Sequence, residues 1–233
     1  MGSDSPEDFW LFGYGSLIWK PPPHFDQRIP GYIQGYVRRF WQLVLNNFPS
    51  EDHRGTPEAP GRVVTLIEKS FWETLDDPQR HTEKDHVWGV AYHIIPSKVR
   101  EVQEYLDIRE INGYSIQYTP FHPADSNLPD IHCLVYIGMP DNPQFLGALH
   151  PQDIAETINS SIGPSGENRE YLLHLEKALE SLSTNSHDEH ITDLARRVRA
   201  LAPPVRLSQL QGSTYALKRV SSTEEQEEIE KEV

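Results

Sequence analysis

Two glycines and a serine near the start of the chain are arranged to bind a carbonyl or an anionic group. The segment Phe12-Gly-Tyr-Gly-Ser-Leu17 ends an apolar run that begins at Phe9. Glycine lets a backbone approach a ligand closely, and successive N–H groups in such a turn converge on one acceptor. The alternative is a plain turn, in which Gly13 and Gly15 serve the backbone alone and Ser16 caps it.

Three better-known glycine motifs do not fit this segment. A dinucleotide fingerprint needs a third glycine where Ile18 stands, and a phosphate loop needs Gly-Lys-Ser or Gly-Lys-Thr, which does not occur. A serine-hydrolase elbow needs glycines two residues before and after Ser16, where the chain has Tyr14 and Ile18. Ser16 is therefore interpreted as a hydrogen-bond donor.

A carboxylate suited to acid–base chemistry lies between a predicted helix and a predicted strand. Asp107, Arg109 and Glu110 occupy this transition, and Glu110 has the apolar neighbour Ile111. In an apolar pocket desolvation would raise the pKa of Glu110 toward the range of a useful base. A solvated carboxylate beside Arg109 is the alternative.

Arginines next to aromatic residues form a third candidate feature. Arg39 precedes Phe40 and Trp41, Arg54 lies in Asp52-His-Arg-Gly-Thr-Pro57, and Arg62 lies in Pro60-Gly-Arg-Val63. A guanidinium pairs with a carboxylate in a two-point fork and stacks on rings. These arginines suit a carboxylate-bearing ligand, although each taken singly also suits a surface ion pair.

The elements that would position these residues are mostly strands at first and helices later. Apolar, β-branched and aromatic content predicts strands near 9–14, 32–45, 61–67, 87–95, 114–121 and 131–137. Val99, Val102 and Leu106 share one face of a helix over 96–106 with Ser97 as its N-cap, and helices follow Pro151. This order predicts an α+β fold built on a small mixed β-barrel or sheet with flanking helices.

Length and charge limit the classes of function. The chain has 233 residues and a formal net charge of −14. We expect one domain over 9–205, a flexible N-terminus over 1–8 and a disordered acidic tail over 221–233. The negative charge disfavours nucleic acid and membrane partners, and neither a signal peptide nor a membrane span is predicted.

Cysteine and histidine usage indicates neither a disulfide nor a metal site. Cys133 is the one cysteine, and it lies in the apolar run 131–137, so we interpret it as a buried hydrophobe. His187 and His190 are interpreted as part of a solvated loop rather than as a metal pair. A single cysteine fits the reducing cytoplasm, with diffusion into the nucleus.

Taken together, the motifs resemble the ChaC-like γ-glutamylcyclotransferases, and within them the fungal glutathione-specific branch. The resemblance covers nearly the whole predicted domain. The segments that carry it are Phe12 to Pro22, Gly35, Arg39 to Gln42, Asp52 to Pro57, Pro60 to Val63, Tyr105-Leu106, Arg109-Glu110, Gly113-Tyr114, Val135 to Gly138 and Gly163 to Gly166.

The resemblance implies a cofactor-free and metal-free lyase with a small β-barrel core, in which Glu110 is the catalytic acid and base. Its substrate would be glutathione, cleaved to 5-oxoproline and Cys-Gly, and no obligate protein partner is implied. A broader γ-glutamyl peptide or amine cyclotransferase and a non-catalytic γ-glutamyl-binding module stay open as alternatives. The residues expected to bind substrate are Leu11, Phe12, Gly13, Tyr14, Gly15, Ser16, Leu17, Arg39, Arg54, Arg62 and Tyr136.

Overall fold

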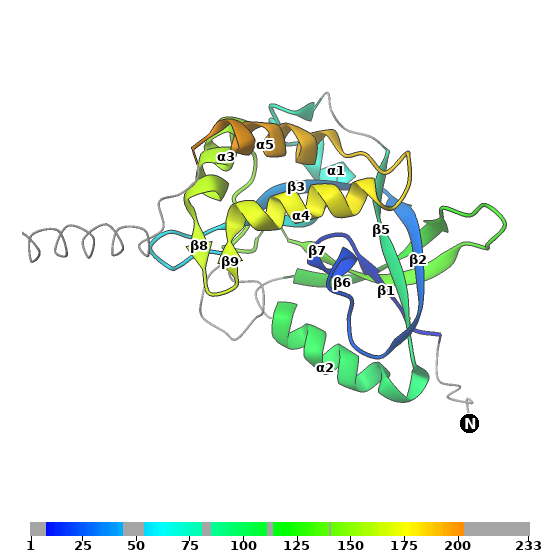
Figure 1. Cartoon of the computed structure of the whole chain (residues 1–233). Helices are drawn as coiled ribbons and strands as arrows, with labels where there is room; N and C mark the ends of the chain where they lie inside the picture. The colour runs from blue at the N-terminus through cyan, green and yellow to red at the C-terminus, as the bar shows by residue number, and fades with distance from the viewer. Residues whose placement is uncertain (1–7, 44–53, 81–84, 111–113, 140, 203–233) are drawn as a thin grey trace, which may run out of the picture. The chain divides into compact units, whose positions relative to one another are not determined.

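A computed structural model of the chain describes residues 8–43, 54–80, 85–110, 114–139 and 141–202. Within them the longer strands all come before residue 139 and three of the longer helices follow residue 150, which agrees with the α+β prediction (Figure 1). The strands are β1 (Trp10–Gly13), β2 (Phe25–Gln34), β3 (Tyr36–Leu43), β4 (Arg62–Glu68), β5 (His86–Ile94), β6 (Tyr114–Pro123), β7 (Ile131–Gly138), β8 (Ile162–Gly163) and β9 (Gly166–Glu167). The helices are α1 (Lys69–Trp72), α2 (Val99–Glu110), α3 (Pro151–Ser160), α4 (Asn168–Glu180) and α5 (Glu189–Ala200), with 3₁₀ turns η1 (Ser16–Ile18) and η3 (Pro96–Lys98).

Five strands close into a barrel in the order β1-β5-β2-β6-β7. The neighbouring strands are antiparallel except at the closure, where β1 and β7 run parallel with Leu11 beside Leu134. Strands β3 and β4 form a separate antiparallel pair. The mixed barrel predicted from the sequence is confirmed.

Aromatic rings fill the inside of the barrel. The rings of Phe12 and Phe121 meet with centroids 5.7 Å apart. Each needs a glycine opposite: a Cβ added at Gly89 would lie 2.6 Å from Phe12 Cζ, and one at Gly31 would collide with the Phe121 ring. Cys133 packs into the same cluster, and burial raises the pKa of its thiol to about 12, which confirms the interpretation of Cys133 as a hydrophobe.

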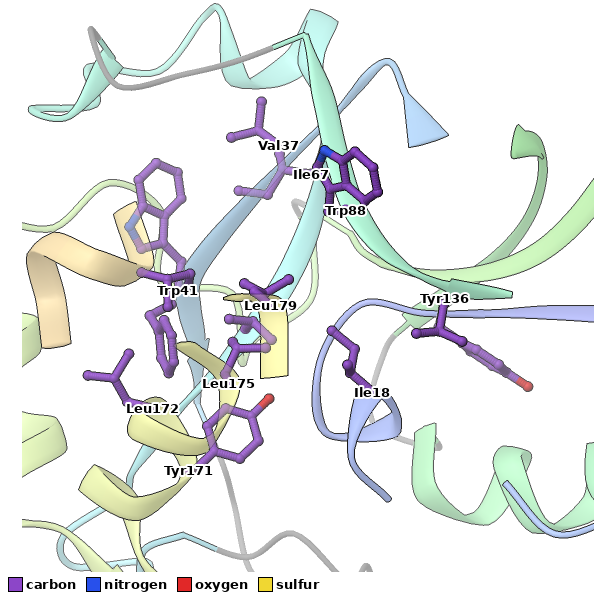
Figure 2. Close-up of a cluster of buried hydrophobic side chains, with 14 of the residues drawn as sticks. Ile18, Val37, Trp41, Ile67, Trp88, Tyr136, Tyr171, Leu172, Leu175 and Leu179 are labelled. Carbon is purple, nitrogen blue, oxygen red and sulfur yellow. The ribbon is translucent and has the colours of Figure 1, made fainter. Parts of the chain in front are cut away.

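A second core lies outside the barrel, where the outer face of the barrel packs against the β3–β4 pair and the helices. Figure 2 shows Leu172, Leu175 and Leu179 of α4 gathered near Trp41 of β3. Their spacing of three and four residues gives α4 the apolar stripe expected of a helix that covers a sheet. Figure 1 shows α3, α4 and α5 together, with α2 on the opposite side of the strands.

Two local predictions differ from the structure. The segment 32–45 is not one strand: Gly35 adopts a positive φ of 83° and separates β2 from β3. Ser97 is not an N-cap of the long helix, because it lies inside η3 and α2 begins at Val99. The consequence for the site is that α2 extends through Glu110, which therefore ends a helix instead of following one.

Candidate functional site

The glycine turn follows β1 directly and has a well-defined backbone. The carbonyl of Gly15 accepts from the N–H of Ile18 at 3.0 Å, and the carbonyl of Ser16 accepts from Trp19 and Lys20 at 3.1 and 2.8 Å. The hydroxyl of Tyr92 on β5 donates to the carbonyl of Leu17 at 2.7 Å. These bonds fix the peptide groups of the turn, so its geometry exists before any ligand arrives.

Both glycines of the turn are required by close contacts. A Cβ added at Gly13 would lie 2.7 Å from the Cβ of Leu17. One added at Gly15 would lie 3.0 Å from Cγ2 of Val64 and 3.1 Å from the hydroxyl oxygen of Tyr171. Gly15 therefore lets the turn approach both β4 and α4 closely.

The barrel topology brings Tyr136 and the end of α2 to the same region. Strands β1 and β7 are parallel, and Leu11 pairs with Leu134. Gly13 and Tyr136, each two residues later in its strand, therefore lie side by side. In Figure 2 the ring of Tyr136 lies on the other side of Ile18 from Tyr171. Tyr114, the first residue of β6, pairs with Gly138, the last residue of β7.

Glu110 is placed at this end of the barrel by its backbone. It is the last residue of α2 and lies four residues before Tyr114, so its Cα is within about 14 Å of the start of β6. It follows the buried Val102 and Leu106 at steps of four, which puts its Cα on the core-facing side of α2. The Glu110 side chain lies outside the described residues, as do 111–113.

Arg54 and Arg62 lie beside the turn, on the segment that leads into β4. Arg54 is 4% exposed, donates from Nη1 to the carbonyl of Glu167 at 3.2 Å, and lies over the Tyr171 ring with Cζ 5.9 Å from its centroid. Arg62 is half-buried and donates to the carbonyls of Pro60 and Gly61, and burial lowers the pKa of its guanidinium. Both guanidinium groups therefore donate to backbone carbonyls of the protein.

Arg39 has a different environment. Its Nε donates to Asp77 at 2.7 Å, and both side chains are 2% exposed. The indole of Trp72 also donates to Asp77, at 2.9 Å. Arg39 therefore belongs to a buried ion pair with Asp77, and its role in substrate binding stays a prediction.

Leu11 and Phe12 are also internal. Both are at most 1% exposed: Leu11 contributes to the outer core and Phe12 to the barrel interior. Their side chains pack in the two cores and so fix the strand from which the turn begins. Tyr14, Ser16 and Leu17 follow in the turn itself and are partly exposed.

The interpretation of His187 and His190 as a solvated pair is wrong for His190. That residue lies in α5, is 1% exposed, accepts from the N–H of Phe40 at 3.2 Å and pairs with Gln79 at 2.7 Å. Its burial, together with Arg39 and Arg38, lowers the pKa of the imidazole. Among the described residues no group of three His, Cys, Asp or Glu is placed to hold a metal.

Sequence reasoning missed two residues at this site, Asn168 and Tyr171. The Asn168 amide accepts from the N–H of Arg62 at 2.7 Å and donates to the carbonyl of Arg62 at 2.8 Å. Both residues begin a helix about 100 positions after the loop that they contact. No local pattern could reveal such a contact, since it depends on how α4 packs.

The comparison with known families decides what kind of protein this is. A family model described as "ChaC-like protein" matches residues 9–201. The chain belongs to the ChaC-like family.

Named relatives of this ChaC-like chain include enzymes from two yeasts. It is 43% identical over 202 residues to the glutathione-specific gamma-glutamylcyclotransferase of Schizosaccharomyces pombe, a match that covers 85% of this chain and 97% of the relative. It is 38% identical to the protein of the same name from Saccharomyces cerevisiae, with 79% of this chain and 90% of the relative covered. These matches are similar in extent to the predicted domain, whose limits at 9 and 205 stay a prediction.

A solved structure shares the fold. The crystal structure of a yeast gamma-glutamyl cyclotransferase specific to glutathione superposes with a TM-score of 0.72 at 35% identity, covering 83% of this chain and 97% of that one. The ChaC-like resemblance and its small-barrel fold are thereby confirmed. Among the described residues, no helix is both long and apolar enough to span a membrane.

Proposed function

We propose that this ChaC-like chain is a glutathione-specific γ-glutamylcyclotransferase, a lyase that releases 5-oxoproline and Cys-Gly. The observation that carries the proposal is the 43% identity to a yeast relative of that name over 97% of its length. The geometry agrees with it, because a preformed glycine turn and the last residue of α2 belong to one end of the barrel. Arg54 lies over the ring of Tyr171, whose hydroxyl is close to Gly15 of the turn, and a buried cation there suits an anionic substrate.

The chemistry is an intramolecular amide exchange. The α-amine of the γ-glutamyl group attacks the side-chain carbonyl of the same residue, closes a five-membered lactam and expels the amine of Cys-Gly. No water enters the products. Holding the folded conformer in place lowers the activation free energy by about 7–11 kcal/mol, by the precedent of well-oriented intramolecular reactions.

Glu110 serves this reaction as base and then as acid. The substrate amine has a reference pKa of about 8, so at neutral pH it must lose a proton before it attacks. Glu110 takes that proton and returns it to the leaving amine, so one carboxyl group completes both transfers. The order balances: one N–C bond forms and one breaks. The attacking nitrogen goes from ammonium to lactam N–H and gives up two protons, one before the attack and one as the tetrahedral intermediate collapses, and the departing nitrogen takes up two and leaves as an ammonium.

The turn from Gly13 to Leu17 stabilises the charge that develops on the carbonyl oxygen. Backbone N–H groups of the turn, with the Ser16 hydroxyl, donate to this oxyanion. The support is the fixed backbone, since the bonds from Ile18, Trp19 and Tyr92 hold the peptide planes. Hydrogen-bond donors that are already oriented stabilise an oxyanion most strongly, because the protein does not have to reorganise during the reaction.

The test is direct. Purified protein is incubated with glutathione, and 5-oxoproline and Cys-Gly are measured; equal amounts of both are expected. N-acetyl-glutathione should give neither, because its amine is blocked. Release of glutamate instead of 5-oxoproline, or cleavage of the acetylated substrate, would identify a hydrolase and contradict the proposal.

A broader substrate range has one observation in its favour. A relative from Arabidopsis thaliana, 41% identical with 82% of this chain covered, is named only gamma-glutamylcyclotransferase 2-3. Glutathione specificity requires a much higher kcat/KM for glutathione than for γ-glutamyl-alanine. Equal values would leave the reaction class standing and remove the specificity.

The cellular setting is part of the proposal. We place the enzyme in the cytoplasm, where glutathione is abundant and reduced thiols persist, and the lone buried Cys133 fits such a compartment. Glutathione is the only partner proposed. Fractionation of cells that express a tagged full-length chain checks this placement.

A further inference from the structure

The Tyr92 side chain lies against both ends of the glycine turn. It is fully buried on β5, in the same core as Ile18 of η1. A Cβ added at Gly13, where the turn begins, would lie 3.5 Å from Cε2 of the Tyr92 ring. At the other end, the Tyr92 hydroxyl donates to the carbonyl of Leu17 at 2.7 Å. One side chain of the barrel therefore contacts the start of the turn and holds its end.

The peptide group between Leu17 and Ile18 is hydrogen-bonded at both of its polar atoms. Its carbonyl accepts from Tyr92, and its N–H donates to the carbonyl of Gly15 at 3.0 Å. The Gly15 carbonyl belongs in turn to the peptide group that carries the N–H of Ser16. Because the C=O and N–H of a trans peptide point in opposite directions, the bond to Gly15 also fixes the direction of the Ser16 N–H.

These contacts form a chain of hydrogen bonds that all run in the same direction. The Tyr92 hydroxyl is the first donor, the Ile18 N–H is the second, and the Ser16 N–H is at the far end. Each bond in such a chain polarises the next and strengthens it by about 10–30%. The Ser16 N–H belongs to the turn that stabilises the oxyanion in the function proposed above, so the chain leads from the barrel to that oxygen.

The first group of the chain is a hydroxyl that keeps its proton at neutral pH. Burial raises the pKa of Tyr92, and the neighbouring Arg28 guanidinium offsets only part of that rise. Arg28 is the cross-strand partner of Tyr92 on β2, and its Nη2 donates to the carbonyl of Ile18 at 3.4 Å. Two side chains of adjacent strands therefore donate to successive carbonyls at the end of the turn.

On the basis of the function proposed above, we propose that Tyr92 is a positioning residue of the reaction, which aims and strengthens the Ser16 N–H through this chain. Tyr92 acts on the turn and not on the substrate. Oxyanion donors stabilise the transition state more than the bound substrate, because the charge develops only during the reaction. The Tyr92 hydroxyl should therefore contribute to kcat and have little effect on substrate binding.

The experiment compares Tyr92→Phe with the wild type in the glutathione assay. Phenylalanine keeps the ring against Gly13 and removes only the hydroxyl. We expect kcat to fall about 10-fold, which is a part of the roughly 10²- to 10³-fold lost when an oxyanion donor is itself removed. KM should change by less than about two-fold, as expected for an interaction that matters in the transition state. An unchanged kcat would overturn the proposal.

Tyr36→Phe is the matched control. Tyr36 is also a buried tyrosine whose hydroxyl donates a hydrogen bond of 2.7 Å, but its acceptor is the side chain of Gln117 on β6. Each variant loses one hydroxyl contact, so the two melting temperatures should fall by similar amounts. Tyr36→Phe should nevertheless keep the kcat of the wild type. An equal loss of kcat in both variants would assign the effect to stability and overturn the proposal.

Nuclear magnetic resonance of the wild type and both variants examines the chain itself. An amide proton moves upfield when its hydrogen bond weakens. Tyr92→Phe should move the amide protons of Ile18 and Ser16 upfield, whereas Tyr36→Phe should move neither. Unchanged Ile18 and Ser16 resonances in Tyr92→Phe would contradict the chain whatever the activity. A wild type that makes no 5-oxoproline would instead contradict the proposed function.

Discussion

At the scale of single residues, the position of Glu110 combines a local signal with a long-range one. Its type and its place before Tyr114 suggested acid–base chemistry, which is a local pattern. Its membership of α2, four residues after the buried Leu106, puts it at the barrel end where β1 and β7 finish. The proposed function requires a carboxylate there to meet a substrate held by the turn.

Replacing Glu110 by Gln should abolish most turnover without unfolding the protein. Glutamine has nearly the same volume, so packing at the end of α2 should survive, whereas it cannot accept and return a proton. Acid–base contributions of about 10²- to 10⁴-fold are typical, and two transfers by one group favour the upper end. The measurements are kcat and the melting temperature with and without glutathione; a kcat within a few-fold of the wild type would remove Glu110 from catalysis.

At the scale of elements, the clearest lesson comes from β4 and α4. Asn168 at the start of α4 forms two hydrogen bonds with the backbone of Arg62 at the start of β4, as a neighbouring strand would. It is fully buried. This contact sets where the Arg54–Arg62 segment lies relative to Tyr171.

Asn168→Ala should therefore cost both stability and activity. It leaves the N–H and carbonyl of Arg62 buried without partners, and each unpaired group costs about 1–3 kcal/mol. Denaturant unfolding should show a loss of about 2–4 kcal/mol, and kcat/KM should fall because Arg62 and Arg54 shift. Asn127→Ala, which removes only a local contact with Asp125 on an exposed turn, should do neither.

A second contact between elements, at His190, should make stability depend on pH. His190 on α5 is buried against β3, and its pKa is well below the usual 6.5. Above about pH 6.5 the imidazole is neutral in both states; below it the unfolded chain binds a proton that the folded protein excludes. Folding should lose about 1.4 kcal/mol per pH unit from about pH 6.5 downward, until the pKa of the folded state is reached.

The check is unfolding of the wild type and His190→Gln between pH 5 and pH 7.5. Glutamine does not titrate, so the stability advantage of the wild type should shrink as the pH falls. A difference that stays constant would mean that the pKa of His190 is the same in the folded and unfolded states, which would contradict the lowered pKa.

The elements also show where sequence reasoning succeeds. Strands β1, β5, β6 and β7 follow apolar runs closely and were predicted within a few residues. Strand β2 was largely missed, because Asp26, Gln27 and Pro30 have low strand propensity and its formation depends on pairing along β5. The parallel closure of β1 on β7 joins residues more than 100 positions apart, which local patterns cannot predict.

At the scale of the whole molecule, the sequence supplied the fold class and the family motifs, but not the site's internal arrangement. The turn was identified from Gly13 and Gly15. Arg39 and Arg54 were both predicted from the sequence to bind substrate. Only packing distinguishes them: one has a buried carboxylate beside it, and the other has a ring and a carbonyl.

The net charge of −14 predicts how ionic strength affects the enzyme. Glutathione has two carboxylates and one ammonium at neutral pH, so a net anion approaches a strongly negative protein. Salt screens this repulsion over a Debye length of about 10 Å at 0.1 M. We therefore expect kcat/KM for glutathione to rise, by roughly two-fold, as sodium chloride increases from low to moderate concentration.

The glycine amide of glutathione, which has no net charge, should respond less. A chain that stops after Val220 lacks six glutamates and one lysine and should show a weaker rise. A kcat/KM that falls with salt would instead mean that the local field of Arg54 and Arg62 governs substrate capture.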